Sequence, residues 1–396
     1  MSRAAEEERR WLGAAFAALC RIESPTGRER ACADWVAAEL RAMGLVPAED
    51  GCAAAARSDA GNLLARIEPA APGAPSIMLC AHLDTVALAA AVEPVLRDGR
   101  WENANAGILG ADNKAAVAVL LAAARRWSAA PPPVGVELLF TVAEEDGLRG
   151  ATAFDPSVLR SAFGYVLDHA SPIGEIVLAS PTYYRIEAEF RGQAAHAGIR
   201  PEDGRSAIAA AATAVAAMPL GRLDADTTVN VGSIAGGSES TNVVPDRCRL
   251  AAEVRSVDPS RAEDVVAETV DRLQDGADAH GCDVDVQVQC LFRGYRTRRT
   301  APAVEVAAAA LRACGHEPRP IATGGGSDAN AFEAAGFSCV NLANGTERNH
   351  EPTEAVSEAA LERMLDVVLA LPAAAASLDG RAEVPAAGGP AEAAAC

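Results

Sequence analysis

The sequence predicts an α/β protein in which a mixed sheet with helices on both faces is interrupted by a smaller α+β domain. Three observations lead to this fold class. Strand-like apolar runs alternate with helical segments from the N-terminus to Ser180. The pattern then changes to strand, helix, two strands, helix and strand, the order of a ferredoxin-like unit. Two candidate metal ligands, Asp168 and His350, lie before and after this unit in the chain. The ferredoxin-like unit is therefore expected to be an insertion in the larger domain.

Three helices and five strands are expected before Ser180. A helical pattern runs up to Ile22, and Ser-Pro-Thr-Gly-Arg-Glu at 24–29 could start a second helix through a capping box of Thr26 and Glu29. A long alanine-rich helix is expected after Asp112. Strand-like runs lie at 62–67, 76–86, 135–143, 164–167 and 175–178. Polar residues that follow strands in such sheets are expected to line a ligand crevice.

The inserted domain has its own order of elements. Its strands are expected at 184–190, 228–234, 249–254 and 284–290, with helices at 207–218 and 261–279. The expected domains are therefore a catalytic domain formed by 1–180 and 293–378, with a lid or dimerisation domain at 181–292 inserted in it. The segment 379–396 is rich in Ala, Pro and Gly and is expected to form a disordered tail.

Composition excludes several classes of partner. Half of the 396 residues are hydrophobic, which is enough for a sizeable core. The net charge of −19, from 35 basic and 54 acidic residues, disfavours nucleic acid and anionic membranes. Neither a signal-like N-terminus nor a run of about 18 apolar residues is present, so a cytoplasmic protein is expected. The ten cysteines form no Cys-x-x-Cys pair, which indicates neither a disulfide framework nor a cysteine zinc site.

Five candidate metal ligands stand out because most of them follow strongly apolar runs. They are His82, Asp112, Glu145, Asp168 and His350. Imidazoles and carboxylates form a ligand mixture that zinc, cobalt or manganese accepts. The set suggests two ions that share one bridging carboxylate, and Asp112 could hold them about 3.5–4 Å apart. Asp112 would also suit a plain helix N-cap.

Two further acids suggest how such a site could work. Asp84 is two residues after His82, so on a strand it points to the same side and could hold the imidazole in one tautomer. Glu144 precedes Glu145, and adjacent residues on an extended segment project to opposite sides. Glu144 could then act as a general base while Glu145 binds metal. A solvated strand end is the alternative interpretation of this pair.

The quoted residues lie in motifs that resemble a known family. The motifs are Ala-His-Leu-Asp-Thr-Val at 81–86, Gly-Ala-Asp-Asn-Lys at 110–114, Ala-Glu-Glu-Asp-Gly at 143–147, Ala-His-Ala-Gly at 195–198 and Thr-Asn-Val-Val-Pro-Asp at 241–246. Over nearly the whole chain up to about residue 375, the sequence resembles the co-catalytic dizinc aminoacylase and carboxypeptidase metallopeptidases, and most closely their peptidase T-like members. The resemblance implies a zinc-exopeptidase catalytic domain. It places His82 and Asp168 on one zinc ion, Glu145 and His350 on the other, and Asp112 between them.

The resemblance also implies residues that contact the substrate. His196 matches a lid histidine that stabilises the oxyanion, often across a dimer. Asn242 and Arg255 resemble lid positions that grip a substrate carboxylate, and Gly325 belongs to a glycine turn beside the substrate. A loop histidine, a turn residue and a surface charge are the alternative interpretations of His196, Asn242 and Arg255.

Two positions qualify the likeness to peptidase T. Asn113 stands where its closer relatives usually have Asp, after a peptide bond that is cis in the family. Asp168 stands where carboxypeptidase and deacylase relatives often have Glu, which favours the aminopeptidase side.

We therefore expect a dizinc hydrolase of small peptides, of the tripeptidase type. An N-acyl amino acid deacylase or a carboxypeptidase with the same site is the alternative, and a non-catalytic peptide-binding protein is a remote one. The expected partners are a small peptide or N-acyl amino acid and a second copy bound through the lid domain.

Overall fold

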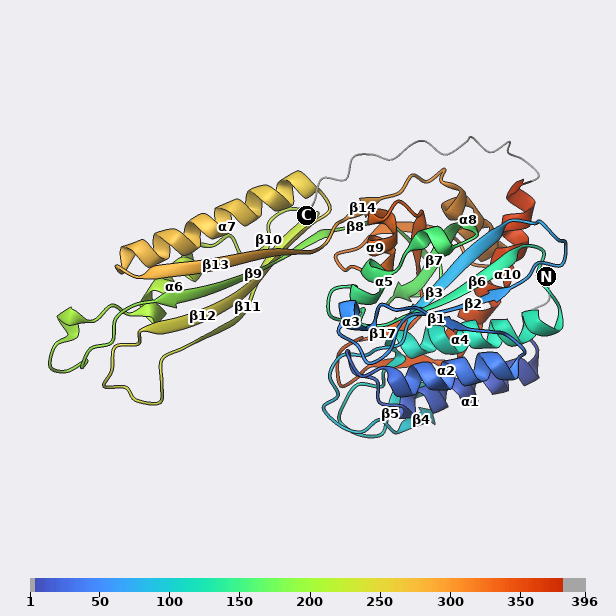
Figure 1. Ribbon diagram of the computed structural model, residues 1–396, viewed down its shortest axis with the longest axis horizontal. Helices are drawn as coiled ribbons and strands as arrows, with labels where there is room; N and C mark the ends of the chain where they lie inside the picture. The colour runs from blue at the N-terminus through green and yellow to red at the C-terminus, as the bar shows by residue number, and fades with distance from the viewer. Residues whose placement is uncertain (1–3, 380–396) are drawn as a thin grey trace. The chain divides into compact units, whose positions relative to one another are not determined.

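The computed structural model describes residues 4–379 and divides the chain into two compact units (Figure 1). The first unit contains the residues up to 178, Thr297–Ala322 and the residues from 327 onward. The second contains Ala179–Arg296 and Thr323–Gly326. The tail expected at 379–396 lies outside the described residues except for Asp379, which ends the last helix. No helix between residues 4 and 379 is long and apolar enough to cross a membrane.

The first unit is built on a mixed sheet with the strand order β1-β2-β6-β3-β7-β16-β8, and β15 pairs with β8. Strands β3, β6, β7 and β16 are parallel, whereas β2 and β8 run antiparallel to their neighbours. Strands β3 and β6 are buried almost throughout, as parallel strands covered on both faces should be. The bounds are β1 Ala48–Glu49, β2 Leu63–Ile67, β3 Ser76–His82, β6 Gly135–Thr141, β7 Ser161–His169, β8 Glu175–Ser180, β15 Arg319–Ala322 and β16 Cys339–Ala343.

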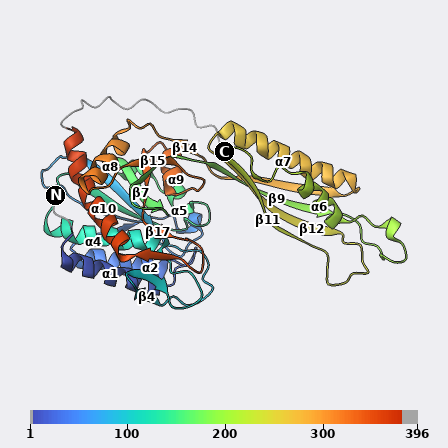
Figure 2. The same ribbon diagram turned by 180° about the vertical axis from the view of Figure 1, so that it is seen from behind.

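Helices cover both faces of this sheet, as expected. The alanine-rich α4 (Ala111–Ala129) packs against β3 and β7, and α1 (Glu6–Arg21), α2 (Arg30–Ala42) and α10 (Glu358–Asp379) pack against α4 (Figures 1 and 2). The other helices of the unit are α3 Ala53–Ala56, α5 Arg149–Ala153, α8 Pro302–Ala313 and α9 Asp328–Ala334.

Neighbouring residues of β7 show that α8 and α9 lie on opposite faces. The Tyr165 hydroxyl donates to the Ala303 carbonyl in α8 at 2.8 Å. A Cβ added to Gly164 would instead meet Phe337, whose ring packs edge-on against Phe332 of α9. Adjacent residues of a strand face opposite sides of the sheet, so the two helices cover different faces.

A small second sheet supports the region around His350. Its strand order is β17-β18-β5-β4, and its strands are short: β4 Pro94–Arg97, β5 Arg100–Asn103, β17 Thr346–Glu347 and β18 Ala355–Ser357. The residues between β17 and β18 carry His350. This sheet was not expected from the sequence.

The expected capping box of Thr26 and Glu29 is wrong. Helix α2 begins at Arg30, and Glu29 at its N-cap has helical dihedral angles and makes no side-chain cap bond. The Thr26 hydroxyl donates to the Asp84 carboxylate at 2.8 Å, and Glu29 accepts from the Gly27 N–H at 2.8 Å. Both side chains bind tertiary or loop partners, which outweigh the local helix-start signal.

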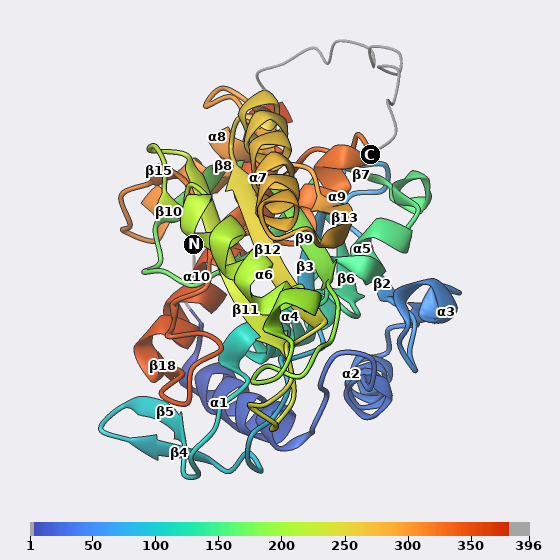
Figure 3. The same cartoon turned by 90° about the vertical axis from the view of Figure 1, so that its left-hand side faces the viewer.

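The second unit is an antiparallel sheet of order β10-β11-β12-β9-β13 (Figure 3). The strands are β9 Thr182–Arg191, β10 Gly221–Arg222, β11 Thr227–Gly236, β12 Arg247–Ser256 and β13 Asp283–Phe292, and β14 (Tyr295–Arg296) pairs with Ala179 and Ser180. Helices α6 (Ala207–Ala217) and α7 (Pro259–Ala279) pack together on one face over Ile186, Phe190 and Leu250. The order matches the ferredoxin-like pattern except for the added β10.

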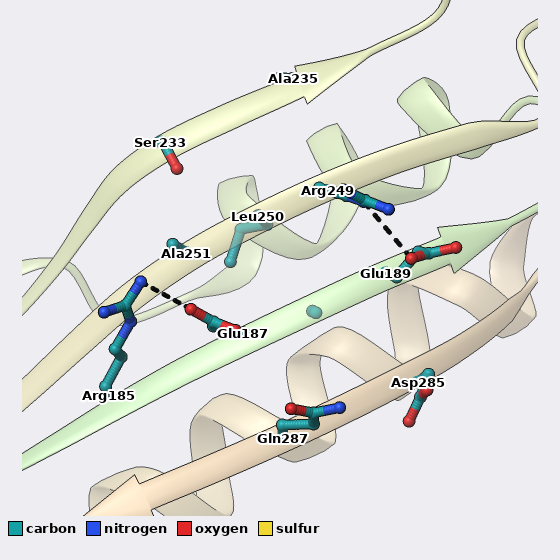
Figure 4. A pocket seen from close by; sticks show the side chains of 11 residues that line it. Arg185, Glu187, Glu189, Ser233, Ala235, Arg249, Leu250, Ala251, Asp285 and Gln287 are labelled. Carbon is teal, nitrogen blue, oxygen red and sulfur yellow. Dashed lines mark ion pairs between the residues drawn. The ribbon is translucent and has the colours of Figure 1, made fainter. Parts of the chain in front are cut away.

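The other face of this sheet is polar. It forms an open groove of about 410 Å³ lined by charged side chains from β9, β12 and β13 (Figure 4). Arg185 lies 2.6 Å from Glu187, and Arg249 lies 3.4 Å from Glu189. The lining also contains Asp285, so three acids face two arginines, and Asp285 lies 3.7 Å from Arg191 beside the groove.

Candidate metal centre

The candidate site lies where parallel strands end at one edge of the first sheet. His82 is the last residue of β3, Glu144 and Glu145 follow β6, and Asp168 is the second-last residue of β7. Because β3 is parallel to both β6 and β7, their carboxyl ends meet at the same edge.

The five predicted ligands lie together in two half-sites that share Asp112. In the first half-site, His82 Nε2 lies 3.2 Å from Asp112 Oδ1 and 3.6 Å from Asp168 Oδ1. In the second, His350 Nε2 lies 3.2 Å from Asp112 Oδ2 and 3.0 Å from Glu145 Oε1. Each half-site therefore offers one imidazole nitrogen and two carboxylate oxygens, and Asp112 gives one oxygen to each.

This donor set fits two divalent cations. Four carboxyl groups crowd around two imidazoles, and potential ligand atoms of His82, Glu144 and Asp168 lie within 4.8 Å of one another. The first half-site is largely buried, whereas the His350 side chain of the second is 51% exposed. Burial and then the charge of Asp112 raise the pKa of Asp168 well above its usual range. Burial alone would lower the pKa of His82, but Asp168 and Asp112 raise it well above the usual range. Such an excess of negative charge is what bound cations neutralise.

Asp84 organises the first half-site and the acidic turn together. His82 Nδ1 lies 3.0 Å from the backbone oxygen of Asp84 and 3.4 Å from its Oδ1, so the ring can donate there and keep Nε2 free. The Asp84 carboxylate also accepts from the backbone N–H groups of Glu144 at 3.0 Å and Glu145 at 3.1 Å. The contact with His82 was expected from the sequence, whereas the contacts with the turn were not.

The acids at 144 and 145 sit on a turn rather than on an extended strand. Strand β6 ends at Thr141, and Ala143 has a φ of 52°, in the left-handed region that a residue with a Cβ seldom adopts. His350 has a φ of 67°. Uncommon backbone conformations of this kind cluster at functional sites. The peptide bond between Asp112 and the fully buried Asn113 is cis.

Three residues around the site were not predicted from the sequence. Asn349 Nδ2 donates to Asp112 Oδ2 at 2.9 Å. Glu354 accepts backbone N–H bonds from Leu109, Gly110 and Asp112 at 2.7–2.8 Å, and burial raises its pKa to about 7. Asp328 is buried and accepts from the Thr141 hydroxyl. Asn349 could have been found as the neighbour of His350, whereas Glu354 and Asp328 carry no local pattern that marks them.

The other predicted residues lie in the second unit. His196 and Asn242 are exposed neighbours, because the backbone of His196 pairs with Val243 and the Ala197 N–H donates to the Asn242 carbonyl at 2.9 Å. Arg255 lies near the far end of β12, eight residues after Arg247, which is roughly 26 Å of strand. Within one copy, Asn242 and Arg255 therefore cannot grip the same carboxylate.

Arg255 already has partners. Its guanidinium carbon lies 4.1 Å from the centre of the Tyr183 ring, and it pairs with Glu253 at 3.2 Å. It also donates to the Gly324 carbonyl at 3.3 Å. The neighbouring Gly325 carbonyl accepts from the Ser180 hydroxyl at 2.9 Å. Arg255 thus braces the glycine turn from within the second unit.

Comparison with known proteins gives matches over both units. Residues 182–280 match the family described as peptidase dimerisation domain, and residues 62–191 match peptidase family M28. The Bacillus subtilis (strain 168) protein YqjE, described as uncharacterized, is 33% identical over 357 residues, which are 90% of this chain and 96% of YqjE.

Two solved structures are similar in fold and sequence. The aminopeptidase PepT from Bacillus cereus has a TM-score of 0.83 and 35% identity, and the match covers 93% of this chain and 99% of that one. A tripeptidase from Staphylococcus aureus has a TM-score of 0.87 and 32% identity, with the same coverage of 93% and 99%.

Proposed function

Because the chain belongs to the M20 family of metallopeptidases and is peptidase T-like, we propose that it is a two-metal aminopeptidase of the tripeptidase type that acts on small free peptides. The observation that carries the proposal is the arrangement of Asp112, whose two oxygens face His82 and His350 separately. A carboxylate placed in this way suits two ions close together better than a single ion.

His82, Asp112 and Asp168 would hold one ion, and Asp112, Glu145 and His350 would hold the other. Zinc is our first choice, and the same donors also accept cobalt or manganese. When bound, the ions polarise the scissile carbonyl and make water more acidic. Asp84 would hold His82 in the ligating tautomer through the Nδ1 contacts.

Glu144 is the proposed general base. Its side chain is buried at 8% exposure, and it lies beside His82 and Asp168. Burial and then the charge of Asp168 raise its pKa well above the usual range, so the carboxylate holds a proton more readily than an exposed glutamate. Glu144 would take a proton from the attacking water and pass it to the leaving amine.

The second unit is the proposed lid and dimerisation domain, with the boundaries 181–292 expected from the sequence. The match of 182–280 to a peptidase dimerisation domain supports a homodimer. We assign oxyanion stabilisation to His196, with Asn242 beside it, and substrate contact to Arg255 and Gly325. A substrate carboxylate would have to displace Glu253 to reach Arg255. A cytoplasmic enzyme remains our prediction from the sequence.

The deciding experiment compares Ala-Ala-Ala, N-acetyl-Ala-Ala-Ala and N-acetyl-alanine as substrates of the zinc- or cobalt-loaded protein, with Glu144→Gln as the inactive control. Release of alanine from the free tripeptide, with both acetylated compounds left intact, supports the proposal. Cleavage of N-acetyl-alanine would instead show a deacylase. Release of the C-terminal alanine from the blocked tripeptide would show a carboxypeptidase. Peptide binding without turnover, despite two bound ions, would show a binding protein.

A further inference from the structure

The turn that carries Glu144 and Glu145 is held by two buried carboxylates from distant parts of the chain. Three consecutive backbone N–H groups point at them. The N–H groups of Glu144 and Glu145 donate to Asp84, and the N–H of Ala143 donates to Glu29 Oε1 at 3.1 Å. Asp84 also contacts a candidate ligand, whereas the hydrogen-bond partners of Glu29 in the described part of the chain lie outside the ligand set. The contact of Glu29 with Ala143 therefore needs an explanation of its own.

The Glu29 side chain is buried, and hydrogen bonds hold its carboxylate in place. Its side chain is 0% exposed, although glutamate is seldom fully buried without partners. Oε1 accepts from the Gly27 N–H at 2.8 Å as well as from Ala143, and Oε2 accepts from the Ser58 hydroxyl at 2.6 Å. These three donors compensate the carboxylate for the water that it lost on burial.

The residue that Glu29 holds has an unusual backbone. Ala143 is fully buried and left-handed, and it immediately precedes the proposed base and the proposed ligand. Such a conformation persists in a residue with a Cβ only where neighbouring contacts determine it. Without Glu29, the Ala143 N–H would lose its acceptor in a dry interior, and relaxation of the turn would move both acids.

We propose that Glu29 is a positioning residue for the reaction, because its carboxylate holds Ala143 in the conformation that aims Glu144 at the substrate water and Glu145 at its ion. This role rests on the proposed function, in which Glu144 is the base and Glu145 a ligand. Outer partners of metal ligands typically matter by roughly 10- to 100-fold in metal affinity or activity.

The chain offers a matched control in Glu137. This residue is also buried, at 2% exposure, and lies in β6 toward the strand end remote from the acidic turn. Its Oε2 accepts from the Arg160 N–H at 2.8 Å and from the Ser161 N–H at 2.9 Å, and its Oε1 lies 2.9 Å from Arg66 Nε. Glu137→Met therefore removes a similar buried carboxylate from the sheet that carries the acidic turn but leaves the turn untouched.

The test compares Glu29→Met, Ser58→Ala and Glu137→Met in the full chain. Methionine has about the length of glutamate but no oxygen to accept the Ala143 N–H. Three measurements are made: zinc titration by calorimetry, steady-state kinetics on Ala-Ala-Ala, and hydrogen exchange of the Ala143 amide. Glu29→Met should lower kcat and the affinity for one ion by roughly 10- to 100-fold, with KM changed less than about threefold, and should speed Ala143 exchange. Ser58→Ala should show a smaller change in the same direction. Glu137→Met should lower thermal stability while zinc affinity and kcat stay within about twofold of wild type.

The proposal is overturned if Glu29→Met matches Glu137→Met in zinc affinity and kcat, whether or not Ala143 exchange becomes faster. Should Glu29→Met not fold, the same comparison for Ser58→Ala decides. Failure of the proposed function looks different: the wild type then cleaves none of the peptides, yet zinc titration and amide exchange still report on Glu29.

Discussion

The proposed roles of Glu144 and Glu145 can be tested against their neighbour Asp146, because the three adjacent acids have different environments. Glu144 is buried beside the first half-site, and Glu145 Oε1 lies 3.0 Å from His350 Nε2. The Asp146 side chain is 57% exposed and lies 2.7 Å from Arg149. Glutamine or asparagine at each position keeps the size of the side chain and removes only its charge and proton affinity.

The expected magnitudes follow from these settings. Loss of a general base costs roughly 10²- to 10⁴-fold in kcat, or about 3–5 kcal/mol of transition-state stabilisation. Glu144→Gln should show this loss while two ions remain bound. Glu145→Gln should lose one ion, and excess metal should restore part of its activity. An exposed ion pair contributes less than about 1 kcal/mol, so Asp146→Asn should keep activity within about twofold.

The assay is a kcat measurement on Ala-Ala-Ala paired with metal content after gel filtration. It should include a pH series, because a base with a raised pKa must be deprotonated to act. Bound cations offset the negative charge that raises the pKa of Glu144 in the metal-free protein. With the metals held saturating, activity should therefore fall as pH decreases through a pKa lower than that of the metal-free protein. The assignment of roles would be refuted by loss of an ion in Glu144→Gln with two ions kept in Glu145→Gln, or by full activity of Glu144→Gln.

Three other outcomes are expected. Asp84→Asn should free at least one backbone N–H of the acidic turn and lower metal affinity by roughly 10- to 100-fold, measured by zinc titration against Thr26→Val, which loses only one donor to Asp84. Burial raises the pKa of Asp328 from 3.8 to about 6, so between these values the folded state keeps a proton that the unfolded state has lost, and stability falls as pH rises. Relative to Asp328→Asn, the chelated wild type should therefore lose about 2 kcal/mol of unfolding free energy between about pH 4.5 and 7.5 in urea titrations, and a difference that does not change with pH would contradict this. Metal at about 100 times its dissociation constant should stabilise the first unit by about 2.7 kcal/mol in calorimetric scans, and an unchanged transition there would contradict metal binding by the folded site.

The sequence predicted the parts of the site that depend on strand order. His82, Glu145 and Asp168 were recognisable because each lies at or near the end of a strongly apolar strand, and parallel strands bring those ends together. Local sequence patterns did not predict the hydrogen-bond partners of side chains that make tertiary contacts. Thr26 and Glu29 had the spacing of a capping box, yet their side chains bind Asp84 and the loops around the site instead.

Two features had no local signal at all. Glu354 is one acid among several polar residues until the fold brings it to the N–H groups of Leu109, Gly110 and Asp112. Strands β4, β5, β17 and β18 are each two to four residues long, too short for a period of two to emerge. Both features join segments that lie far apart in the chain, on either side of the inserted second unit.

The separation of Asp112 from His350 along the chain also has a consequence for biosynthesis. The first half-site is complete in sequence at Asp168, but the second lacks an imidazole until His350 has been added. At about 5–20 residues per second, the time between the addition of Asp168 and the addition of His350 is roughly 9–36 s. A nascent chain can therefore present ligands for one cation well before it can hold two. A chain whose synthesis has not reached His350 lacks the imidazole of the second half-site and cannot hold the two ions that the proposed hydrolysis needs.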